Sequence, residues 1–129
     1  MKTCIVELQK AVFEALSTLT DAPCYGIVPP NTEPPYRSIG SDVSNTWFSN
    51  KSNNSELVTI TINHFTRGKS FIPCKQLAAA TVEKLTVPEN YIMDNFDCIT
   101  AFVSSIIPTS EPDFIQRVIV QIDLRVKEK

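Results

Sequence analysis

The sequence predicts an α+β fold, in which two helices pack on one face of a largely antiparallel sheet of four to five strands. Two segments place apolar residues at helical spacing, and several others alternate apolar and polar residues as half-buried strands do. Helices and strands do not alternate regularly along the chain, which favours an antiparallel over a parallel sheet. The 129 residues suit a single domain, residues 1–129.

The first predicted helix covers residues 2–19. Its apolar face consists of Ile5, Leu8, Val12, Ala15, Leu16 and Leu19. Pro23 lies just beyond it and disfavours helical backbone before it. A short extended piece is expected over residues 24–28, followed by a stiff connector over residues 29–35, where four of seven residues are proline.

The second predicted helix is capped by Ser70, has Pro73 in its first turn and stops at Val87 and Pro88. Its expected buried face consists of Cys74, Leu77, Ala78, Thr81, Val82 and Leu85.

Strands are predicted over residues 36–44, 57–66, 96–107 and 114–127. The last one alternates most clearly, with Val118, Val120, Ile122, Leu124 and Val126 on one side. Residues 45–55 read as a long hairpin loop between the middle strands, and residues 108–112 as the connection between the last two.

Composition excludes several classes of function. The net charge of −2 gives no basic surface for tight binding to nucleic acid or anionic membranes. The three glycines are dispersed, whereas phosphate-binding loops need clustered glycines. Four cysteines at wide spacing form no metal-binding or redox pair, so we expect reduced, mostly buried thiols. No cofactor, metal or membrane segment is expected, and neither is a targeting segment, so the chain should fold in a reducing cytoplasm.

Residues able to perform catalysis are few. His64, the only histidine, could be a general base or a hydrogen-bonded histidine at the edge of the core, and no partner can be assigned to it from the sequence. A cysteine could be a nucleophile, but burial as a small apolar side chain is the favoured interpretation. We therefore expect no catalytic residues and no enzymatic activity.

The predicted hairpin loop carries the strongest candidate for an interaction surface, because two large aromatic residues stand in a stretch rich in Asn and Ser. Such rings are costly on the surface of a monomer and are enriched where a partner buries them. The alternative is that both rings fold back onto the sheet. The candidate interface residues are Thr46, Trp47, Phe48, Asn50, Lys51, Asn53 and Asn54.

Several segments in this order resemble the small tail-completion proteins of long-tailed bacteriophages, the family of tail terminators and tail-to-head joining proteins. The most specific piece runs from Val28-Pro29-Pro30 to Pro34-Pro35-Tyr36 and into a strand. The resemblance also includes the first helix, the strand beginning at Leu57, the Ala-rich second helix and the closing strand, and so covers nearly the whole chain.

The resemblance implies an α+β subunit that forms a hexameric ring at the head-proximal end of the tail tube, without catalysis. It implies self-association, with free subunits as monomers, and contacts with the tail tube protein and with a head–tail connector or neck protein. The loop 44–55 would engage neighbouring subunits or the tube, and passive contact with DNA in the lumen stays open. The protein would reside in the virion, after assembly in the host cytoplasm.

Two alternatives remain. The chain could form another neck ring, such as a head-completion or connector protein. It could also be a small ligand-binding or enzymatic α+β domain.

Overall fold

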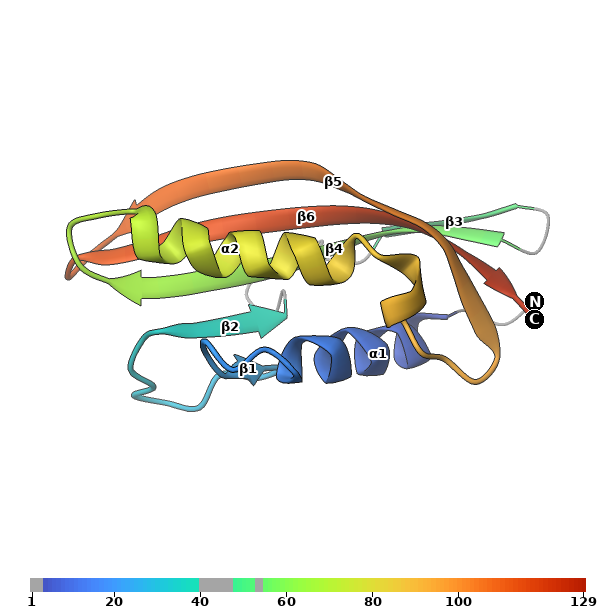
Figure 1. Cartoon of the computed structure of the whole chain (residues 1–129), viewed down its shortest axis with the longest axis horizontal. Coiled ribbons are helices and arrows are strands. Elements are labelled where there is room, and N and C mark those ends of the chain that lie inside the picture. The colour runs from blue at the N-terminus through green and yellow to red at the C-terminus, as the bar shows by residue number, and fades with distance from the viewer. Residues whose placement is uncertain (1–3, 40–47, 53–54) are drawn as a thin grey trace.

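The computed structural model describes residues 4–39, the backbone of residues 48–52, and residues 55–129. Within these ranges the chain forms two α-helices and one six-stranded sheet. Helix α2 (Ile72–Leu85) runs along the long strands β4 and β6, and α1 (Ile5–Ser17) lies beside α2 (Figure 1). All but one of the strand pairs are antiparallel, so the predicted α+β class is confirmed.

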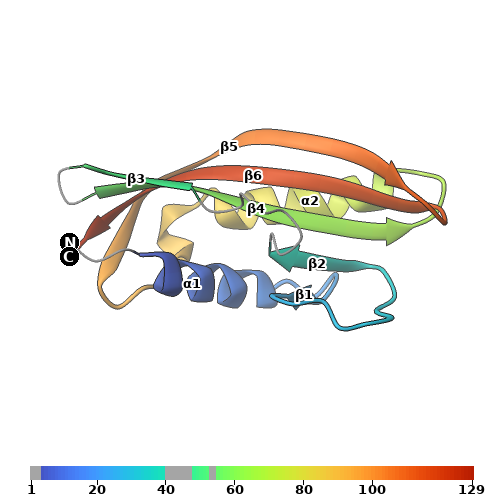
Figure 2. The ribbon, with the colours of Figure 1, turned by 180° about the vertical axis from the view of Figure 1, so that it is seen from behind.

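The sheet has the strand order β1-β2-β4-β6-β5. These strands are β1 (Cys24–Tyr25), β2 (Tyr36–Ile39), β4 (Ser55–Arg67), β5 (Phe96–Glu111) and β6 (Ile115–Glu128). Only β1 and β2 run parallel among the described strands. The long strands β4, β6 and β5 cross most of the molecule side by side (Figure 2). One edge of β4 is shared, because β2 pairs with its second half and β3 (Phe48–Ser52) with its first half.

Two predicted connections turn out to contain strand. The expected loop 45–55 includes β3, which forms a hairpin with β4, because its polar residues tolerate an edge position. The expected connection 108–112 is mostly strand as well, since β5 extends to Glu111. Pro108 is tolerated there because β5 lies at the sheet edge, where a missing N–H removes no bond from the ladder.

The helices are close to the predicted ones. The N-cap of α2 is Phe71 and not the predicted Ser70, because the helix begins one residue later than expected. Ser70 Oγ still accepts a hydrogen bond from the Ile72 N–H at 3.1 Å. Val82 is only half-buried, unlike the rest of its predicted face. A short 3₁₀ helix, η1 (Pro88–Asn90), follows α2 where Pro88 was expected to end it.

The core lies between the helices and one face of the sheet. Its main members are Leu8, Val12 and Leu16 of α1, Cys74, Ala78 and Leu85 of α2, Val58, Ile60 and Ile62 of β4, and the predicted inward series Val118, Val120, Ile122, Leu124 and Val126 of β6.

One fully buried charge joins the layers. The Arg37 guanidinium on β2 forms a two-pronged ion pair with Asp21, with Nη1–Oδ1 at 2.7 Å and Nη2–Oδ2 at 3.0 Å. Its Nε–H donates to Thr81 Oγ1 at 2.8 Å, and Nη2–H also donates to the Leu77 carbonyl at 3.0 Å. The segment after α1, strand β2 and helix α2 are thereby fixed to one another.

We predict that Asp21→Ala lowers the free energy of unfolding by about 3 kcal/mol, because it leaves the Arg37 charge buried without a counterion. Glu33→Ala is the matched control, since its ion pair with Arg67 is mostly solvent-exposed and such pairs contribute less than about 1 kcal/mol. Urea denaturation of both variants measures the difference. Equal losses in the two variants would contradict a special role for the buried pair.

Candidate functional site

The predicted interface residues divide into two groups. Thr46, Trp47, Asn53 and Asn54 lie outside the described residues. Phe48, Asn50 and Lys51 lie on β3, where their backbones pair with Thr59, Leu57 and Glu56 of β4. This part of the predicted interface is therefore a regular edge strand and not a loop.

Next to this hairpin, the face of the sheet opposite the helices is hollowed. The hollow has a volume of about 460 Å³ and is lined by side chains of β4, β5 and β6, among them Leu57, Thr59, Thr100, Phe102, Asp123 and Arg125. Phe102 on the edge strand β5 is 56% exposed and Leu57 on β4 is 44% exposed, so two large apolar side chains lie open on this face. The Thr59 hydroxyl donates to Asp123 Oδ1 at 2.7 Å. We call this surface the outer-face hollow.

Sequence reasoning missed Phe102 because β5 is irregular. Its register against β6 shifts between Cys98 and Thr100 and again between Val103 and Ser105. Each extra residue reverses which side chains face the helices, so no simple alternation can be read from residues 96–111.

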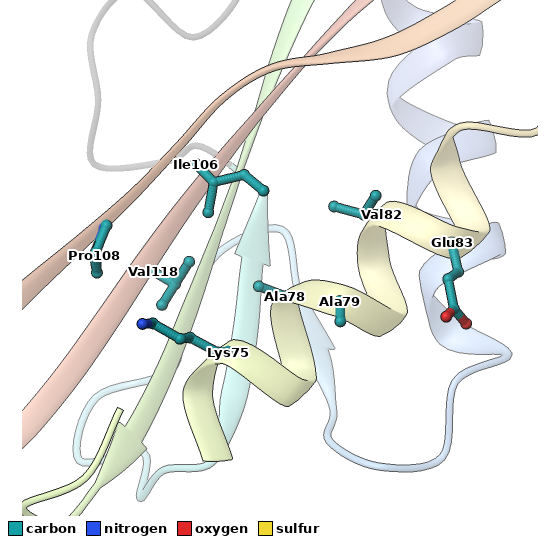
Figure 3. A pocket seen from close by; sticks show the side chains of 8 residues that line it. All are labelled: Lys75, Ala78, Ala79, Val82, Glu83, Ile106, Pro108 and Val118. Atoms are coloured by element: carbon teal, nitrogen blue, oxygen red, sulfur yellow. The ribbon is translucent and has the colours of Figure 1, made fainter. Parts of the chain in front are cut away.

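A second apolar surface lies on the helix side of the sheet, between α2 and β5. This groove, which we call the α2–β5 groove, has a volume of about 570 Å³. Ala78, Ala79 and Val82 of α2 form one wall, facing Ile106, Pro108 and Val118 of β5 and β6 (Figure 3). Lys75 and Glu83 lie toward its two ends on α2 (Figure 3). Ile106 is 53% exposed here because β5 extends past the area that α2 covers.

His64 is buried, and both of its ring nitrogens are engaged. Nδ1 lies 2.9 Å from the Val118 carbonyl oxygen, which can only accept, so Nδ1 carries the proton. Nε2 lies 2.6 Å from Thr81 Oγ1 and accepts from that hydroxyl, which itself accepts from Arg37. Burial lowers the pKa of His64 to about 4. Of the two interpretations, the hydrogen-bonded core histidine matches this arrangement, and a general base would need a free nitrogen.

The four cysteines carry free thiols, as expected. Cys4 and Cys74 are buried, and burial raises the pKa of Cys24 and of Cys98 to about 11. These thiols stay protonated near neutral pH, which disfavours a nucleophilic role. Among residues 4–39 and 55–129, no group of three or more His, Cys, Asp or Glu side chains is placed to hold a metal ion.

Helices of the described part of the chain are too short or too polar to cross a bilayer.

The geometry defines a small α+β domain with two separate apolar surfaces on opposite faces of its sheet. No protein-family model matches the chain, and no curated protein sequence does. Among solved structures, a chain of the virion of a native gene transfer agent particle is similar, with a TM-score of 0.78 and 19% sequence identity. The match covers 98% of this chain and 99% of that chain. The two chains therefore share one fold over their whole lengths.

We predict that the protein loses stability as the pH falls from 6.5 to about 4, because the unfolded chain protonates His64 in this window while the folded chain does not. The pKa difference corresponds to at most about 3 kcal/mol. Asp21, whose pKa is lowered from 3.8 by its hydrogen bond to Arg37, adds a loss of the same sign at lower pH.

Urea titrations between pH 7 and pH 4 measure this slope, and His64→Gln is the control. That variant should be less stable at pH 7 and should lose most of the slope above pH 4.5. An unchanged slope in His64→Gln would contradict the assignment.

Proposed function

We propose that this protein is a structural virion subunit of a phage or phage-derived particle, which caps the head-proximal end of the tail tube as a ring, stops tube growth and joins tail to head. The observation that carries the proposal is the fold shared, end to end, with a chain of a gene transfer agent virion. The sequence resemblance to tail-completion proteins supports the finer assignment to a tail terminator.

A ring built from one kind of subunit needs two different, complementary patches on each copy, because every contact is head-to-tail. The outer-face hollow and the α2–β5 groove are separate apolar surfaces on opposite faces of the sheet. Such a subunit could therefore present one apolar surface to a neighbour and the other to the tail tube.

The resemblance further suggests that residues 44–55 engage neighbours or the tube. Residues 48–52 of this segment form the edge strand β3 in the subunit, and an edge strand offers unpaired backbone groups to a docking partner.

The proposed role is structural and not catalytic. The engaged nitrogens of His64 and the high pKa values of the Cys24 and Cys98 thiols support this choice over a small enzyme. The net charge of −2 suits contacts with protein better than tight binding of DNA in the lumen.

The direct test adds the purified protein to polymerising tail tube protein from the same particle and images the product by negative-stain electron microscopy. Tubes with a ring at one end and limited length are expected. Uncapped tubes that keep growing would overturn the terminator role, and co-purification with a portal-adjacent protein in place of the tube protein would favour another neck ring.

We predict that the double variant Trp47→Ala with Phe48→Ala weakens capping of tubes and changes the free energy of unfolding by less than about 0.5 kcal/mol, as substitutions outside the core do. Ile27→Ala, at an 87% exposed position outside both apolar surfaces, is the control and should cap normally. Thermal unfolding and the capping assay are run on the same samples. A loss of several kcal/mol would instead place the two rings in the core.

A further inference from the structure

The hairpin between β5 and β6 has an unfavourable residue at its tip. Asp113 and Phe114 both have left-handed backbone, with φ of 64° and 59°, and the Ile115 N–H returns to the Pro112 carbonyl at 3.4 Å. Turns whose two central residues both have positive φ favour Asn-Gly, since glycine adopts positive φ without strain. A bulky Phe at the second position is strained.

Two hydrogen bonds from residues outside the turn stabilise its strained backbone. The Gly68 N–H donates to the Phe114 carbonyl at 2.7 Å, and Arg67 Nη1–H donates to the Asp113 carbonyl at 3.0 Å. The Phe114 ring nevertheless gains little from this position, because it is 63% exposed, with Lys69 Nζ 5.8 Å from its centroid. Strain is thus maintained at a mostly exposed aromatic residue, although the subunit gives its ring only a surface cation–π contact with Lys69. Strain at such a residue points to a contact with another molecule.

The α2–β5 groove is an apolar recess of about 570 Å³ on the same subunit. Phe114 cannot fill the groove of its own chain. The groove ends at Val118, four residues away along β6, and about 13 Å of extended strand separates the two positions.

We propose that the Phe114 ring of one copy inserts into the α2–β5 groove of the next copy, so that the hairpin tip and the groove are the two halves of a head-to-tail contact. This inference rests on the proposed function, because a ring requires such a pair of unlike patches. A single aromatic anchor in an apolar recess is a common centre of a protein interface. Charges of both signs stand on each half: Asp113 and Lys69 at the ring, and Lys75 and Glu83 toward the two ends of the groove, so opposite charges can pair across the contact.

Variants of the tip separate folding from association. Phe114→Ala and Phe114→Gly should each weaken self-association at least tenfold, measured by sedimentation or by native mass spectrometry of the whole chain. Phe114→Gly should also raise the unfolding temperature, because glycine relieves the positive φ. Ile27→Ala, at an 87% exposed apolar position outside both apolar surfaces, is the control and should associate like the wild type.

A mixed disulfide tests the geometry. Phe114→Cys and Ala79→Cys are made separately in a Cys24→Ser, Cys98→Ser background, which removes the two half-buried native thiols. Oxidised mixtures of the two proteins should give a covalent dimer, and each protein alone should give far less. Ala79→Trp fills the groove from the exposed side of α2. It should therefore prevent the Phe114 ring of another copy from entering the groove and so block self-association.

The inference would be overturned if Phe114→Ala still formed rings as the wild type does, or if the mixture gave no more disulfide than either protein alone. It would also be overturned if Ala79→Trp no longer bound the tube protein but still self-associated. The last result would assign the groove to the tube protein. Each of these results leaves the capping role intact, whereas a mixed disulfide in a protein that caps no tubes would sustain the contact and refute the role.

Discussion

The Arg37 side chain on β2 has no contact with solvent, and two other parts of the chain converge on it. Its hydrogen bonds go to Asp21 in the segment after α1 and to Thr81 and the Leu77 carbonyl of α2. A buried guanidinium is tolerated only when its donors are satisfied and its charge is balanced. The positions of β2 and of both helices therefore depend on one another, and His64 extends the same network to β6 through Thr81. Both apolar surfaces are formed by strands and a helix whose relative positions depend on this hydrogen-bond network.

The fold class could be predicted because the strongest patterns are local. The alternation of Val118 to Val126 and the helical stripe from Leu8 to Leu16 both place their apolar residues in the core. The partnership of Arg37 and Asp21 could not be predicted, since Pro23 and a proline-rich connector separate two residues that meet only when β2 joins the sheet. Strand β3 was read as loop because its residues Phe48–Ser52 are mostly polar, and its pairing with β4 is a tertiary effect.

The candidate site was less predictable than the fold. The aromatic pair Trp47 and Phe48 was visible because large rings stand out in a polar segment. Phe102 and Ile106 were hidden, because two register shifts in β5 decide which face each one occupies. The α2–β5 groove depends on how far β5 extends past α2. The sequence of either segment alone does not give this relative position. Surfaces that form where one element leaves another uncovered can be identified only from the folded structure.

Strand β5 has a further consequence for assembly. A long strand at the edge of a sheet offers unpaired backbone groups to any other strand. Edge strands of different copies can therefore pair one after another and aggregate. Here the edge is interrupted by two register shifts and by Pro108, which has no N–H to donate. Direct pairing of β5 with a strand of another copy is thereby disfavoured. A subunit whose proposed task is to stop a polymer is thus protected, at its longest edge, from forming one by strand pairing.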